Sequence, residues 1–174
     1  GELVKPIHPM LTNALVNNVA FKILTIMGLI PIWVILFFLF KPDFSGVSLI
    51  GVLLSIPIMM VAFFIGFLLS ATIVSLAFWT TRVYSIHEFY FAIILLFSGQ
   101  FVPLPLMPKV IQDIAQFLPF QLFMYYPIQL ILGKLSAEQI LQGYVMAGVW
   151  LVISILFFNW VWREGVKRFS AVGA

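Results

Sequence analysis

The chain has 174 residues, of which 63% are hydrophobic and only 9% are charged, and its mean hydropathy is +1.16. A water-soluble domain carries about a quarter charged residues, so the composition excludes a water-exposed globule and makes lipid the solvent for most of the surface. The absence of cysteine excludes disulfides and thiolate metal sites. The net charge of +3 comes from Lys and Arg placed mainly at the ends of apolar runs, which is typical of membrane orientation rather than nucleic-acid binding.

Residues 1–20 are mixed in polarity, and Pro6 and Pro9 exclude a regular helix at the start. Leu11, Leu15 and Val19 then recur at a spacing of four, which allows a short helix. We interpret this stretch as an interfacial segment outside the bilayer core. Because it lacks the layout of a signal peptide and the chain begins with Gly rather than Met, we expect the chain to be part of a longer protein.

The first predicted span covers residues 21–40. Twenty residues at 1.5 Å each cross a hydrocarbon core of about 30 Å. Lys22 lies at its edge, where its ammonium group can reach the lipid headgroups. Pro31 predicts a kink near the middle of this helix, which membrane helices tolerate.

The uncharged stretch from 44 to 81 allows either one long helix or two short spans joined by a tight turn. The placement of Lys and Arg favours a single crossing over about 46–79. With one crossing, six cations lie on one side and three on the other, in keeping with the excess of Lys and Arg in cytoplasmic loops. The six are Lys5, Lys22, Arg82, Arg163, Lys167 and Arg168, and the three are Lys41, Lys109 and Lys134.

A third span is predicted over residues 83–102, followed by a proline-rich, apolar stretch from 103 to 135. In that stretch the pattern predicts a helix from Pro108 to about Leu118 and a second one from Pro127 to Leu132, which ends at Gly133. The first helix has a polar face and an apolar face; the apolar face consists of Val110, Ile111, Ile114, Phe117 and Leu118. Both are too short to span a bilayer, so we expect this region either to lie in the outer interface or to dip into the bilayer and return.

The motif Ser136-Ala-Glu-Gln139 is a capping box that predicts the start of the last helix. This helix contains the fourth span, about 141–162, and leads into a cationic tail over 163–174. Gly143 and Gly148 are five residues apart, which does not match the Gly-x3-Gly contact motif. The fold class is therefore an all-α integral membrane protein with four transmembrane helices and short, non-spanning outer helices, forming a single domain.

Motifs for catalysis are absent from the sequence. The only Gly-Lys pair, Gly133-Lys134, is followed by Leu135 and lacks the other residues of a phosphate-binding loop. His87-Glu88 begins a zinc-protease motif, but Phe91 replaces its second histidine. Arg82, His87 and Glu88 are polar candidates at the cytoplasmic boundary; they are either solvated and paired there, or they line a polar cavity or gate. We predict no catalytic, metal-binding or cofactor-binding residue in the chain.

The order of several short motifs resembles the ABC-2 family of transport permeases, the membrane subunits of ATP-binding-cassette exporters. The similarity is greatest to the six-span bacterial branch, and its motifs extend over nearly the whole chain. They are Gly1-Glu-Leu3 with Lys5-Pro6, Ser98-Gly-Gln-Phe-Val-Pro-Leu-Pro-Leu-Met-Pro108, Leu118-Pro-Phe120, Tyr125-Tyr-Pro127, Leu132-Gly-Lys134, and the ending from Arg163 to Gly173.

The resemblance implies that the chain is a C-terminal fragment without the first two spans. Residues 1–18 would then match a cytoplasmic loop that docks onto the ATPase, with Glu2, Lys5, Pro6 and Pro9 as candidate contacts. The region 103–135 would match an outer hairpin that acts as a lid on the export path. The candidate gate residues are Gly99, Pro103, Pro105, Pro108, Pro119, Tyr126 and Pro127.

The implied mechanism is alternating access, in which two permease subunits, identical or related, enclose a path. Partner ATPase subunits use ATP and Mg and transmit their movement through the docking loop, while Pro31 and Pro57 are candidate flexible points. The implied location is the bacterial inner membrane, with both ends of this segment in the cytoplasm. The alternatives are a membrane-embedded lipid-modifying enzyme, which would need convergent polar groups in a cleft, and a membrane assembly protein without a transport path.

Overall fold

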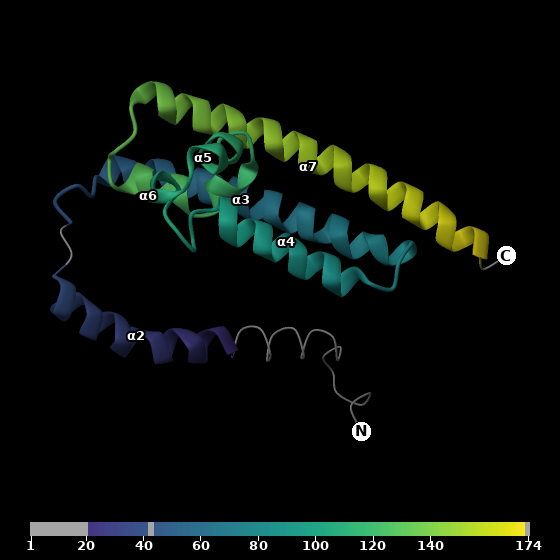
Figure 1. Ribbon diagram of the computed structural model, residues 1–174, viewed down its shortest axis with the longest axis horizontal. Coiled ribbons are helices and arrows are strands. Elements are labelled where there is room, and N and C mark those ends of the chain that lie inside the picture. The colour runs from purple at the N-terminus through teal and green to yellow at the C-terminus, as the bar shows by residue number, and fades with distance from the viewer. Residues whose placement is uncertain (1–20, 42–43, 173–174) are drawn as a thin grey trace, which may run out of the picture. The chain divides into compact units, whose positions relative to one another are not determined.

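The computed structural model describes residues 21–41 and 44–172, and the surroundings of side chains within 23–41 and 44–168. These residues form helices and connecting segments, and no strand occurs among them. The contacts divide the chain into two compact units, of which the first ends at Phe44 and the second begins at Ser45. Figure 1 shows the helices of both units.

The first unit contains α2, which runs from Phe21 to Phe40 as one helix with Pro31 inside it. Every described side chain of α2 is exposed, although most of them are large and apolar. The helix ends where Lys41 adopts a left-handed backbone conformation with φ 42°. A helix that is apolar on all sides and unburied is stable only in a lipid environment or against other apolar helices.

The second unit is built on two long helices, α3 (Leu49–Ser75) and α7 (Ala137–Val172), which pack side by side (Figure 1). α3 is a single helix that continues into the 3₁₀ turn η3 (Leu76–Phe78), so the stretch predicted as one long span contains no internal turn. α7 begins after Ser136, whose hydroxyl accepts the Gln139 N–H at 3.3 Å while the Gln139 side chain accepts the Ser136 N–H at 2.9 Å. The predicted capping box is confirmed.

Small residues occupy most of the buried positions of α7. The buried positions of α7 include Gly143, Ala147, Ser154, Val161 and Gly165, and small side chains let helix backbones approach closely in lipid. Gly148, by contrast, is exposed and has open space around it. On α3, the hydroxyls of its buried Ser and Thr residues donate to carbonyls three or four residues earlier, which satisfies them without water: Ser55 to Val52, Thr72 to Leu68, and Ser75 to Ala71.

α4 (Val83–Phe97) lies against α3 and is shorter than the predicted span over 83–102. Its 15 residues rise only about 22 Å. The helix ends early because Ser98 is fully buried and its carbonyl accepts the Tyr125 N–H at 3.0 Å. Gly99 then takes a left-handed conformation with φ 77°, which turns the chain away from the helix axis.

Four short helical elements connect α4 to α7. They are the 3₁₀ helices η4 (Leu104–Leu106) and η5 (Pro119–Phe123), and the α-helices α5 (Lys109–Ala115) and α6 (Tyr125–Ile131). None spans more than seven residues. We call residues 98–135, which contain all four, the cap.

Among the described residues, three helices are long and apolar enough to cross a membrane, over Ile23–Phe40, Leu49–Phe78 and Ala137–Arg168, and α4 is a shorter apolar helix. The chain is therefore a multi-pass membrane protein.

Candidate functional site

The outer part of the cap, residues 101–118, forms around a small cluster of its own. Leu104, Met107 and Ala115 are buried together. The Gln112 side chain donates to the Met107 carbonyl at 2.7 Å and to the Pro105 carbonyl at 3.3 Å. These bonds tie α5 to the preceding turn, so the proline-rich stretch is an ordered structure rather than an open loop.

The predicted apolar face of α5 is only partly buried. Ile111 and Leu118 are half-buried, whereas Val110, Ile114 and Phe117 are exposed. The buried position is instead Ala115, which packs in the cluster with Leu104 and Met107. The sequence pattern identified the apolar residues of the helix, but it did not show which of them have a protein partner.

The inner part of the cap, residues 119–132, is buried between the long helices. Leu122 and Leu130 are almost fully buried and join Ile58, Ile65 and Ala147 in the main core cluster. The inner cap is therefore an integral part of the packing of α3 and α7.

Tyr126 joins the inner cap to the first turns of α7. Its hydroxyl lies 3.0 Å from the Ile140 carbonyl oxygen and 3.1 Å from that of Gln139, and donates to them. Burial, and to a smaller extent the neighbouring Tyr144, raise the pKa of Tyr126 to about 12, so the hydroxyl stays protonated and keeps donating at neutral pH. A Cβ at Gly143 would overlap the Tyr126 ring and hydroxyl, so the contact requires glycine there.

The inner cap also contacts the start of α3. The Ser48 N–H donates to the Ile131 carbonyl at 3.1 Å, and a Cβ at Gly51 would overlap the Leu130 carbonyl oxygen. α6 ends at Ile131, and the predicted stop residue Gly133 follows two residues later in a left-handed conformation with φ 63°. The Gly133 N–H donates to the Leu130 carbonyl and the Lys134 N–H to that of Gln129, which is the hydrogen-bond pattern of a Schellman stop.

The candidate gate residues fall into two groups in the structure. Pro119, Tyr126 and Pro127 are buried in the inner cap, and Gly99 is half-buried against the Tyr125 side chain. Pro103, Pro105 and Pro108 are exposed on the outer cap, where they begin or shape η4 and α5. The structure therefore places these residues in one folded region but does not bring them together around one cavity.

A family model for the ABC-2 family transporter protein matches residues 2–173 of the chain. The chain belongs to the ABC-2 transporter family. No curated protein matches it, and no solved structure does. The family membrane domain is typically a non-catalytic permease, and its members in general work with an ATPase partner.

The cytoplasmic-boundary candidates of this ABC-2 protein lie at the start of α4. Arg82 is exposed and is the residue that precedes the helix, and Glu88 is exposed as well. His87 is half-buried, with its ring centroid 6.1 Å from that of Tyr90. In the described part of the chain, neither Arg82 nor Glu88 forms a salt bridge. The docking candidates Glu2, Lys5, Pro6 and Pro9 lie outside the described residues.

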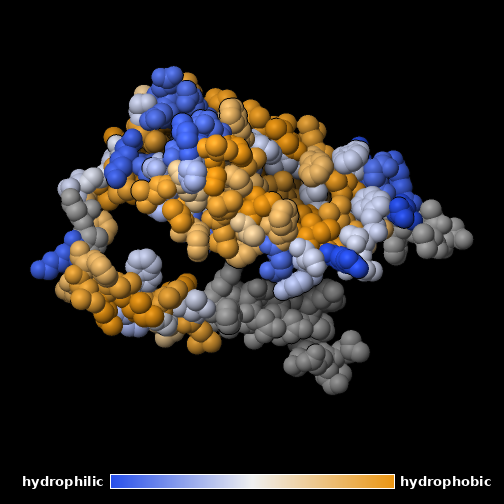
Figure 2. Space-filling model, viewed as in Figure 1, coloured by the Kyte–Doolittle hydropathy of each residue, from blue (hydrophilic) through white to orange (hydrophobic). Residues whose placement is uncertain are grey.

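Charged side chains of the ABC-2 protein gather at the two ends of the second unit, and apolar side chains cover the middle (Figure 2). The cap end carries the exposed ion pair of Lys109 with Asp113, at 3.0 Å, and also Lys134. At the other end, the Phe78 ring of η3 lies 5.8 Å from the Trp162 ring of α7. Arg82 follows Phe78 by four residues in the chain, and Arg163, Lys167 and Arg168 follow Trp162. Lys109 and Lys134 therefore lie on the cap, whereas Arg82 follows the opposite end of α3 in the chain.

A contact that the sequence did not reveal lies beside Pro57, inside α3. Proline has no N–H, and its ring disturbs the helical hydrogen bonds of the preceding turn. The Tyr144 hydroxyl of α7 donates to the Leu54 carbonyl at 2.6 Å, three residues before the proline. Neighbouring helices often satisfy backbone groups in this way in membrane proteins. No spacing rule predicts it, because it joins residues that are 90 positions apart.

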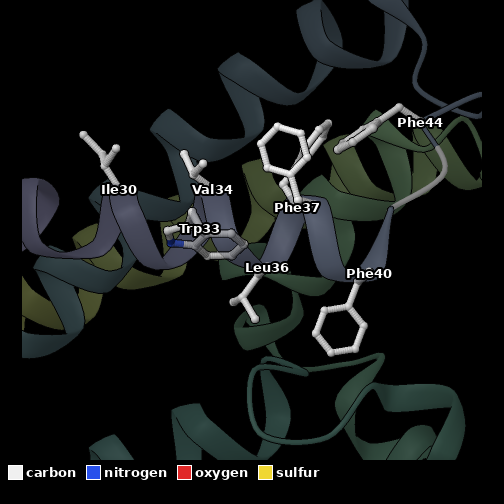
Figure 3. A pocket seen from close by; sticks show the side chains of 8 residues that line it. Ile30, Trp33, Val34, Leu36, Phe37, Phe40 and Phe44 are labelled. Carbon is white, nitrogen blue, oxygen red and sulfur yellow. The ribbon is translucent and has the colours of Figure 1, made fainter.

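A hollow of about 970 Å³ lies along α2 and is lined by Ile30, Trp33, Val34, Leu36, Phe37, Phe38, Phe40 and Phe44. Figure 3 shows that these side chains do not converge: Ile30 and Val34 point to one side of the helix, and Leu36 and Phe40 to the other. We therefore interpret this region as the apolar surface of a membrane helix, with no built site for a ligand.

Proposed function

We propose that this chain is a membrane-spanning permease subunit of an ATP-binding-cassette exporter. In this proposal it forms part of the translocation path with a second permease subunit, identical or related. A separate ATPase subunit binds ATP and Mg and drives the cycle. The observation that carries the proposal is membership of the ABC-2 family across residues 2–173.

The packing of the cap supports the role of an outer lid. Its inner part is held to both long helices, by Tyr126 on the α7 side and by the Ser48–Ile131 hydrogen bond on the α3 side. A relative movement of α3 and α7 would therefore be transmitted to the cap. The same geometry supports the proposed orientation in the bacterial inner membrane. In this orientation, Arg82 and the end of α7 lie on the cytoplasmic side.

The proposal is tested by expressing the chain within its full-length protein together with the candidate ATPase. Co-purification of the two, and ATP-dependent transport into inverted vesicles that is lost when the phosphate-binding lysine of the ATPase is replaced, are the expected results. Purification of the permease without any ATPase, under conditions that preserve its fold, would contradict the proposal.

The proposed orientation has its own test, which is simplified by the absence of cysteine from these 174 residues. Cysteines introduced at Thr81 and Ser170 should be protected from an impermeant thiol reagent in intact cells and become reactive after permeabilisation. A cysteine at Lys134 is the matched control and should be labelled from outside. Labelling of position 81 or 170 in intact cells would show that the orientation is wrong.

A further inference from the structure

A groove of about 510 Å³ lies between α3 and α4 and is closed at one side by Phe123 of η5. Its volume falls within the range of small-molecule sites. The lining is almost entirely apolar and comes from three elements, with Met59, Phe63 and Gly66 on α3 and Ile94 on α4. Its only polar side chains are Ser70 and Tyr90.

The polarity of the groove changes along its length. Met59 and Ser70 are eleven residues apart on α3, which corresponds to roughly 16 Å of helix. Near Met59 the walls are hydrocarbon, whereas Ser70 and Tyr90 bring two hydroxyls into the other part of the groove. Beyond Tyr90, one helical turn towards the start of α4, lies the half-buried His87.

The Tyr90 hydroxyl is shielded from solvent and has no partner at hydrogen-bonding geometry among the described residues, although Ser70 lies close enough to interact with it. A buried hydroxyl without a hydrogen bond costs about 1–3 kcal/mol. The ring is held in place independently, since its centroid lies 6.1 Å from that of Phe120, which in turn lies 5.9 Å from Phe123. The hydroxyl is therefore positioned at the groove with capacity for a further hydrogen bond.

We propose that this groove binds the acyl chain of a single-chain amphiphile, with its polar group at Tyr90 and Ser70 and its chain end near Met59. A length of roughly 16 Å suits an extended alkyl chain of about a dozen carbons. A polar oxygen at the head of the chain supplies the hydrogen bond that the Tyr90 hydroxyl lacks. The inference rests on the proposed function in that it names the class of cargo, but binding itself can be measured without the ATPase.

The test uses the full-length protein in phospholipid nanodiscs and two photoactivatable 12-carbon monoacylglycerols. One carries a diazirine at the end of the chain and the other carries it beside the carbonyl group. Crosslinks mapped by mass spectrometry should place the chain-end probe near Met59 and Phe63, and the other probe near Ser70 and Tyr90. Labelling should saturate and be displaced by unlabelled monoacylglycerol but not by added two-chain phospholipid.

Matched variants test the walls of the groove. A Cβ at Gly66 would make ordinary contact with the Phe123 ring at 3.5 Å, so Gly66→Leu should fill the groove and abolish saturable labelling. Gly148→Leu, at an open position, should leave labelling unchanged. Tyr90→Phe should weaken binding about three- to tenfold, the effect of one lost hydrogen bond, and Tyr84→Phe, at an exposed position of the same helix, should not.

The inference is overturned if the probes label the exposed faces of α3 and α7 uniformly, if they bind in the reverse orientation, if added phospholipid displaces them, or if Gly66→Leu and Tyr90→Phe leave saturable labelling unchanged. Because binding is measured in the absence of ATP, its failure is distinct from a failure of ATPase coupling.

Discussion

Replacing Gly143 by Ala tests whether the close approach of Tyr126 holds the cap on α7. The added Cβ would overlap the tyrosine ring and hydroxyl, so the ring must move and its hydrogen bond to the α7 carbonyls is lost. Overpacking of this kind costs about 1–3 kcal/mol, and a lost hydrogen bond about 0.5–1.5 kcal/mol. The higher helix propensity of Ala offsets at most about 1 kcal/mol, so we expect a net loss of about 0.5–4.5 kcal/mol.

The assay is unfolding of the purified protein in mixed micelles with increasing SDS, followed by circular dichroism. Gly148→Ala is the matched control, because it gives the same gain in helix propensity at a position with open space. This control should be neutral or slightly stabilising. A double-mutant cycle with Tyr126→Leu separates the clash from other effects, because removing the ring should make Gly143→Ala nearly neutral. If Gly143→Ala is as stable as Gly148→Ala, the reasoning is refuted.

Three further changes should destabilise the fold in the same SDS titration. Tyr144→Phe removes the donor to the Leu54 carbonyl and should cost about 0.5–1.5 kcal/mol. Unchanged stability would contradict a stabilising role for this hydrogen bond. Gly51→Ala brings a Cβ against a backbone carbonyl of α6, which cannot rotate away. The substitution should therefore lower the stability by about 1–3 kcal/mol. It should also loosen the cap, which would be detected as faster proteolysis within residues 98–135. Gly133→Ala forces a left-handed conformation on a residue with a Cβ and should cost about 1–2 kcal/mol; no change in stability would show that the Schellman stop is dispensable.

Local signals in the sequence predicted local structure well. The capping box at Ser136 and the glycine stop at Gly133 are both formed by residues within a few positions of each other, and the structure shows the hydrogen bonds of each. The end of α4 was predicted less well, because the span was extended to residue 102 past Gly99, a residue type that commonly stops helices. The helix ends at Phe97 because the Ser98 carbonyl pairs with Tyr125, a residue of a different element.

The contacts of the cap could not be read from spacing. Gly143 was compared with Gly148 on the same helix, whereas its partner is the side chain of Tyr126 in α6. Tyr144 likewise contacts a carbonyl that is far away in the sequence. The groove at Tyr90 gave no sequence signal either, because an apolar run with one tyrosine and one serine is ordinary in a membrane helix.

The sequence by itself determined that this protein is embedded in lipid, that its long apolar runs form helices, and that its charges lie mainly between these runs. These properties follow from composition and from the rise of a helix compared with the thickness of a bilayer. Only the tertiary structure decided which apolar residues face a protein partner and which remain exposed. In lipid, a buried and an exposed leucine have nearly the same solvation, so hydropathy does not distinguish them. The choice is made by the fit of small residues and hydroxyls between helices.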